Sequence, residues 1–99
     1  MVRADAVHTA IDLLDSRIMI VDDEVVNVRV VHKQLERLGY QNLTRTTDST
    51  QVLRQLRQKQ PDLLLLDVMM PEVSGFAILE AMQSDDDLRS IPVLVLTAM

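Results

Sequence analysis

Hydrophobic positions along the chain alternate between short continuous runs and segments with helical spacing. Continuous apolar runs predict strands at residues 17–21, 63–66 and 91–96. A short polar run at residues 42–46 is of the type tolerated at the edge of a sheet. Between these runs, apolar residues recur every three or four positions, which predicts amphipathic helices.

The helical segments each have one apolar face. The first ends at Gly39, where a left-handed C-terminal cap is expected, and the second ends at Pro61. Asp48 or Ser49 is expected to cap the start of the second. In chain order the apolar positions are Val28, Val31, Leu35 and Leu38, then Val52, Leu53 and Leu56, then Phe76, Leu79 and Met82.

Strand and helix alternate, with connections too short for anything but right-handed crossovers. This order predicts an α/β fold with a parallel sheet, helices on both faces, about four strands and about three crossover helices. Residues 5–15 also have apolar side chains at helical spacing, so a leader helix is expected. We therefore expect a leader at residues 1–16 and one small domain at residues 17–99.

The composition of the chain argues against several classes of function. The formal net charge is -5 and 2% of the residues are aromatic, which argues against binding of nucleic acid. No run approaches the roughly 18 apolar residues of a membrane-spanning helix, and the first residues lack the apolar centre of a secretory signal. Without cysteine there is no disulfide framework or thiolate zinc site. We expect a cytoplasmic protein that does not bind a membrane.

Polar side chains follow three of the predicted strands. Asp22 and Asp23 follow the first, Asp67 ends the third, and Thr97 ends the fourth. Ligands of parallel α/β sheets bind beyond the carboxyl ends of the strands, so these residues converge if their strands are neighbours. Grouped carboxylates oppose one another's ionisation, and an all-oxygen site favours a hard cation such as Mg2+. An aspartate beside such a cation can act as a nucleophile and form an acyl phosphate.

The acidic pair and Thr97 each have an ordinary explanation when taken alone, whereas Asp67 is harder to dismiss because a carboxylate at a strand end is a poor core residue. An Asp-Asp pair before a helix commonly caps it, and Thr97 suits a strand. The ordered combination on successive strand ends is what predicts a functional site. His8 and His32 lack partners at ligand spacing and are expected to be structural.

Three ordered motifs resemble the receiver domain of two-component response regulators. Residues 18–24 are similar to the first strand and acidic pair of that family. Residues 63–71, followed by Gly75, resemble its acceptor strand and loop. Residues 91–98 resemble its fourth strand with the switch hydroxyl.

The resemblance implies a flavodoxin-like, doubly wound fold and a signalling role rather than an enzyme. A sensor histidine kinase or phosphotransfer protein would donate a phosphoryl group to Asp67, and Thr97 would be the switch hydroxyl. Mg2+ would be held by Asp22 or Asp23, by Asp67 and by the backbone carbonyl of Met69. Asp23 is expected to coordinate directly and Asp22 through water.

The family pattern also has a fifth strand, with a lysine at its end, and further helices that the sequence lacks. Lys33 and Lys59 fall inside predicted helices and do not replace that lysine. The sheet is therefore expected to be incomplete through C-terminal truncation, which would impair phosphotransfer. Residues 91–96 would then form an exposed edge, and we expect a homo-oligomer formed through this strand or through exchanged elements.

Two other functions fit parts of the pattern. One is an interaction module that keeps the receiver fold, is not phosphorylated and works by dimerising. It differs from the phosphoacceptor in that Mg2+ and a small phosphodonor would not modify Asp67. The other is a haloacid-dehalogenase-like phosphatase, which ranks last because Met69 stands where that family needs a second aspartate.

Overall fold

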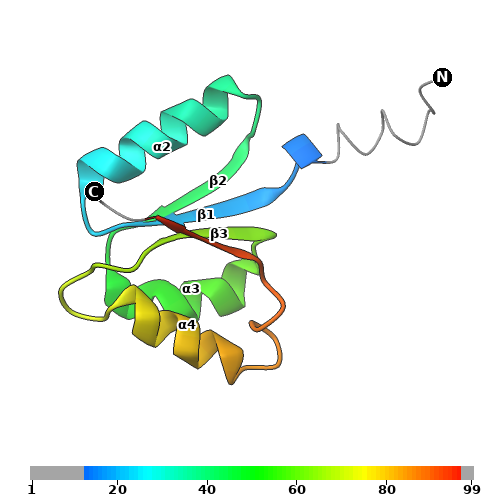
Figure 1. The fold of residues 1–99 in the computed structure, drawn as a ribbon. Coiled ribbons are helices and arrows are strands. Elements are labelled where there is room, and N and C mark those ends of the chain that lie inside the picture. The colour runs from blue at the N-terminus through cyan, green and yellow to red at the C-terminus, as the bar shows by residue number, and fades with distance from the viewer. Residues whose placement is uncertain (1–12, 97–99) are drawn as a thin grey trace.

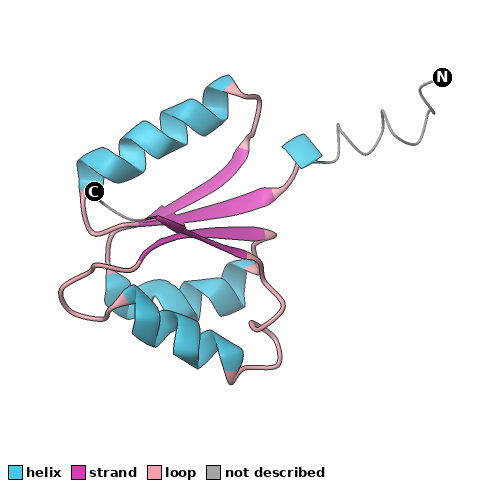
Figure 2. Ribbon diagram, in the orientation of Figure 1, coloured by secondary structure: helices cyan, strands magenta, loops and turns pink. Residues whose placement is uncertain are grey.

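The computed structural model describes residues 13–96. This part of the chain forms a four-stranded parallel sheet in the order β2-β1-β3-β4, with helices on both faces (Figure 1, Figure 2). The predicted α/β fold is confirmed, and the strand order is that of flavodoxin-like sheets. The elements are β1 (Arg17–Val21), α2 (Val25–Arg37), β2 (Asn42–Thr46), the 3-10 turn η1 (Ser49–Gln51), α3 (Val52–Lys59), β3 (Leu63–Asp67), α4 (Gly75–Gln83) and β4 (Val93–Leu96).

The two faces of the sheet are covered by different helices. Figure 1 shows α2 on one side and α3 with α4 on the other. Successive side chains of a strand point to opposite faces. Ile18 and Ile20 of β1 accordingly pack with Val28 of α2, whereas Met19 and Val21 lie in the core formed with α3 and α4. Burial on both faces explains the continuous apolar run of β1.

The helix ends follow local signals in the sequence. Gly39, at a φ of 103°, stands directly after the C-cap of α2, as predicted. The Asp48 carboxylate accepts a hydrogen bond from Thr50 N and begins η1, so the predicted second helix opens as a 3-10 turn before α3. The Ser74 hydroxyl accepts a hydrogen bond from Ala77 N and begins α4.

Two side chains expected on apolar helix faces are exposed instead. Leu38 was predicted to face the core, but it is 68% exposed because α2 has ended and the chain turns at Gly39. Phe76 lies in the first turn of α4 and is 62% exposed. That helix buries Gly75, Ile78 and Met82.

The fourth strand starts later than predicted. It begins at Val93 rather than at residue 91. Ile91 still belongs to the preceding loop, because its N–H donates to Leu88 O. Pro92 has no N–H, although its carbonyl accepts a hydrogen bond from Leu64 N of β3.

Parts of the predicted leader and site lie outside the described residues. Leu13 and Leu14 are helical, and Ser16 N donates to Leu13 O in the turn that follows. The rest of the predicted leader helix and Thr97 are not described. None of the described helices is long and apolar enough to cross a membrane.

Candidate functional site

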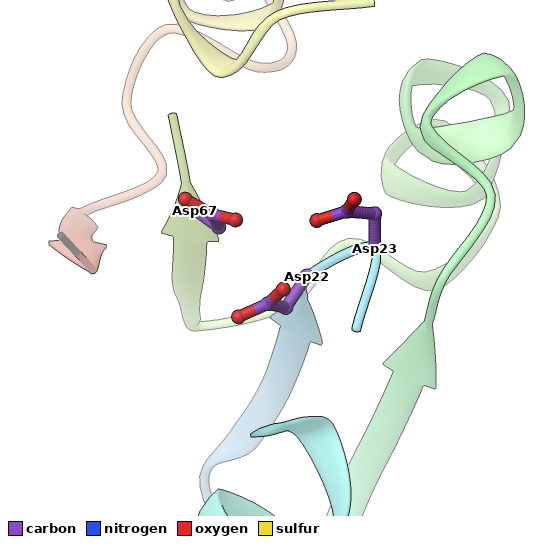
Figure 3. A group of neighbouring side chains, drawn as sticks. All are labelled: Asp22, Asp23 and Asp67. Atoms are coloured by element: carbon purple, nitrogen blue, oxygen red, sulfur yellow. The ribbon is translucent and has the colours of Figure 1, made fainter. Parts of the chain in front are cut away.

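Asp22, Asp23 and Asp67 meet at the carboxyl edge of the sheet. β1 and β3 are parallel neighbours with Val21 opposite Leu66, so the residues that end the two strands lie side by side. Each carboxylate offers one oxygen atom such that all three atoms lie within 4.8 Å of one another. Figure 3 shows Asp23 and Asp67 pointing toward each other, with Asp22 next to both. The predicted convergence of these three carboxylates is present.

The Asp22 carboxylate is buried and is hydrogen-bonded to residues at the start of α2. Asp22 is 6% exposed, and its Oδ1 accepts a hydrogen bond of 2.9 Å from Glu24 N. Its Oδ2 accepts a longer hydrogen bond of 3.4 Å from Asn27 Nδ2. Asn27 was not identified from the sequence, although its place in the first turn of the helix after the acidic pair is a usable signal.

Burial raises the pKa of Asp22 above its ordinary value, and the negative charges of Asp67 and Asp23 raise it further. The hydrogen bonds from Glu24 N and Asn27 act in the opposite direction because they favour the ionised carboxylate. The net upward shift means that full ionisation of the cluster is unfavourable. A cation among the three carboxylates would reverse this effect.

Asp67 has one oxygen engaged by the main chain and one available. Its Oδ1 accepts a hydrogen bond of 2.9 Å from Met69 N. No residue of the described chain donates a hydrogen bond to its Oδ2. Asp67 is only 7% exposed, whereas the side chain of Met69 is 70% exposed. The main chain at Met69 is thus held next to Asp67 while its side chain points away from the core.

The loop between β3 and α4 is held by one hydrogen bond to η1 and by one between its own first residue and the start of α4. Val73 N donates to the hydroxyl of Ser49, which is 8% exposed, at 3.2 Å. Gly75 N donates to Val68 O, also at 3.2 Å. The contact of Ser49 spans 24 positions of the chain, and nothing in the local sequence indicated it.

Comparison with known proteins decides the family. The family model of the response regulator receiver domain matches residues 18–99. The chain belongs to this receiver-domain family. A curated relative, the polar-differentiation response regulator DivK of Brucella anthropi, is 38% identical over 81 residues. That match covers 82% of this chain and 65% of the relative, so the chain spans about two thirds of the length of this receiver protein.

Solved receiver structures have the same fold. The N-terminal domain of a response regulator receiver protein from Methanoculleus marisnigri JR1 is 39% identical with a TM-score of 0.79, over 85% of this chain and 68% of that chain. The chemotaxis response regulator CheY4 of Vibrio cholerae is 25% identical with a TM-score of 0.78, over 86% of this chain and 70% of that chain. The receiver fold implied by the sequence motifs is therefore confirmed.

Proposed function

We propose that this receiver domain is a phosphoacceptor, and that Asp67 receives the phosphoryl group. The observation that carries the proposal is the set of three carboxylate oxygens within 4.8 Å of one another at the carboxyl edge of the sheet. The donor would be a phosphohistidine on a sensor histidine kinase or a phosphotransfer protein. Relatives named as response regulators support this class of partner.

The oxygen atoms that could coordinate a metal ion at this site are suited to Mg2+. They belong to carboxylates, and this hard cation prefers oxygen ligands. Burial is the main cause of the raised pKa of Asp22, and the charges of Asp67 and Asp23 add to it. We assign the ion to Asp23, Asp67 and the backbone carbonyl of Met69, with Asp22 acting through water. When bound, Mg2+ neutralises charge on the carboxylates and on the phosphoryl group during transfer.

Asp67 is suited to act as the nucleophile because its Oδ2 faces no described hydrogen-bond donor. In the proposed step, an oxygen of Asp67 forms a bond to phosphorus as the phosphorus–nitrogen bond of the phosphohistidine breaks. The imidazole nitrogen keeps the electron pair, and Asp67 becomes an acyl phosphate. Met69 N holds Oδ1 and so orients the carboxylate.

The phosphoacceptor proposal also includes a role for Thr97, a signalling function and a division of the chain into two segments. Thr97 is the residue we propose to hydrogen-bond the new phosphate group. The chain assists phosphorylation of its own aspartate and otherwise acts as a signalling component, in the cytoplasm. We assign residues 17–99 to the receiver unit and residues 1–16 to a leader.

Self-association is a second proposal, supported by the exposure of β4. Within residues 13–96, β4 pairs only with β3. Leu94 is 57% exposed and Val95 is 41% exposed, and an apolar edge strand is a template for pairing with another chain. We propose that two copies associate through this strand or exchange elements. Light scattering over a range of concentrations tests this, and a monomer throughout contradicts it.

The phosphoacceptor proposal is tested by intact mass after incubation with Mg2+ and acetyl phosphate. We expect the gain of one phosphoryl group in the native chain and none in Asp67→Asn. No gain in the native chain would favour an interaction module that is not phosphorylated. A gain that persists in Asp67→Asn would mean that another residue is the acceptor.

A further inference from the structure

A groove between α2 and β2 gathers positive charge on an acidic protein. The formal net charge of the chain is -5, yet this groove of about 690 Å³ is lined by Arg29 and Lys33 of α2 and by Arg45 of β2. All three side chains are exposed. The volume lies in the range of small-ligand sites, roughly 300–1,000 Å³.

The two helical charges form a row along one wall. Arg29 and Lys33 are four residues apart in α2, so they lie on one face, about 6 Å apart along the helix axis. Arg45 reaches the same groove from the strand. A ligand in the groove therefore meets cations from two elements rather than a single surface charge.

Acidic groups of the wall do not neutralise this row. Among residues 13–96, Glu36 is the one acidic residue that lines the groove, and its Oε2 lies 3.7 Å from His32 Nε2. In the part of the chain that the structure describes, Arg29, Lys33 and Arg45 make no ion pair with an acidic side chain. Three positive charges thus remain available to a ligand.

The basic side chains that line the groove are suited to bind oxyanions. An arginine guanidinium can bind a phosphate or carboxylate through two parallel hydrogen bonds, and lysine adds a point charge. Thr47 also lines the groove, and its hydroxyl is a hydrogen-bond donor. The described lining includes no phenylalanine, tyrosine or tryptophan, the side chains that form most stacking platforms for bases.

We propose that this groove is a binding site for a ligand with two or more oxyanion groups, phosphate or carboxylate, spaced about one helical turn apart. The site is separate from the carboxylate cluster. Thr47 lines both the groove and a hollow beside Asp23, whereas Asp22 and Asp67 line neither. Binding should therefore require neither Mg2+ nor Asp67, and its failure would leave the phosphoacceptor proposal unaffected.

The test is an NMR titration of the chain in Mg2+-free buffer containing EDTA. Two probes are used separately, tripolyphosphate and a hexaglutamate peptide, and the tighter of them identifies the ligand as phosphate or carboxylate. We expect backbone shifts to change around residues 25–36 and 45–47. The double variant Arg29→Gln/Lys33→Gln should bind at least about tenfold more weakly, because each lost charge-assisted hydrogen bond is worth about a tenfold step.

A matched control separates this site from general attraction between charges. Arg54→Gln/Lys59→Gln removes the same charge from exposed positions of α3 and should weaken binding by less than about twofold. Arg45→Gln probes the opposite wall and should also weaken binding. Equal weakening in the two double variants, an unaffected Arg45→Gln, or no localised shift change with either probe would overturn the proposal.

Discussion

Gly75 lies directly against the main chain of Val68. Its N–H donates to Val68 O at 3.2 Å. A Cβ atom at this position would lie 2.4 Å from Val68 Cα and 2.5 Å from Asp67 O. Both neighbours are backbone atoms, which cannot rotate away as the end of a flexible side chain can. Any side chain here must therefore separate α4 from the strand end that carries Asp67.

Gly75→Ala should lower both stability and affinity for Mg2+. The forced shift of the backbone is expected to cost roughly 1–3 kcal/mol in the free energy of unfolding. Because the shift moves the main chain between Asp67 and Met69, Mg2+ should bind more weakly. Urea denaturation followed by circular dichroism measures the first effect, and calorimetric titration with Mg2+ measures the second.

Gly39→Ala is the matched control for this prediction. Gly39 has a φ of 103°, so alanine is strained there and should cost about 1 kcal/mol. The nearest described atoms to a Cβ at this position belong to the side chain of Leu14, at 3.4 Å, and that side chain can shift. Affinity for Mg2+ should stay unchanged in this variant. An equal loss of affinity in both variants would mean that lower stability, rather than the contact with Val68, weakens the site.

Asp22→Asn should stabilise the Mg2+-free protein at neutral pH. The pKa of Asp22 is raised in the fold, mainly by burial, so its ionised form disfavours folding above that pKa. Asparagine removes the charge and can still accept the hydrogen bond from Glu24 N. The melting temperature in EDTA should rise by a few degrees, on the order of 4 °C for 1 kcal/mol in a domain of this size.

The same variant should respond less to Mg2+ than the native chain. Added Mg2+ stabilises a folded protein by an amount that grows with the logarithm of its affinity. Asp22→Asn removes one negative charge from the cluster and should lower that affinity. Thermal melts with and without Mg2+ compare the two proteins. A native chain that melts at the same temperature in EDTA and in excess Mg2+ would contradict the assignment of a metal site.

The sheet and its acidic edge were predictable because both depend on short-range patterns. Ile18, Ile20 and Leu65 belong to continuous apolar runs, and such runs suit strands that helices cover on both faces. Once parallel order is inferred, the residues after β1 and β3 must share an edge. The convergence of Asp22 and Asp67 was predicted on the condition that their strands are neighbours, and the pairing of β1 with β3 meets that condition.

Other features depend on contacts that periodicity does not encode. The hydrogen bond between Val73 N and Ser49 joins two loops, and the charged groove depends on how Arg45 lies relative to α2. Leu38 continues the helical period of α2, but the helix ends before that position can be buried. Helix ends and loop packing are therefore where the sequence predictions were least complete.

Asp85 should contribute stability that is lost in acid. A hydrogen bond from Asp87 N lowers the pKa of Asp85, and the Arg57 guanidinium at 3.2 Å lowers it further, although burial acts the other way. The folded state thus binds this proton more weakly than the unfolded state. The stabilisation is present above the ordinary pKa of aspartate and disappears as the pH falls through the lowered value.

Asp85→Asn should therefore be less stable than the native chain at neutral pH, and the difference should shrink in acid. Asp86→Asn is the neighbouring control, because in the described part of the chain the Asp86 carboxylate makes an exposed ion pair of 3.4 Å with Arg89, and such pairs contribute little. At neutral pH the stability of this variant should differ from that of the native chain by less than about 1 kcal/mol. Urea denaturation over a series of pH values makes the comparison, and a constant deficit of Asp85→Asn across the series would contradict the linkage to its protonation.

Leu88 should be a much larger contributor to stability than Leu38, although only Leu38 fits a helical pattern. Leu88 lies in the polar connection between α4 and β4, yet it is 0% exposed and packs in the core with Leu56 and Ile78. Leu88→Ala should cost about 2–5 kcal/mol because it leaves a cavity. Leu38→Ala should change stability by no more than about 0.5 kcal/mol, since that side chain is 68% exposed.

Urea denaturation of both leucine variants, followed by circular dichroism, tests this difference. If Leu88→Ala is too unstable to fold, Leu88→Met keeps the volume of the side chain and should cost less than about 1.5 kcal/mol. Similar small losses in Leu88→Ala and Leu38→Ala would show that the connection does not close this side of the core. A large loss confined to Leu88→Ala would establish that this one apolar residue anchors the acidic connection to the core.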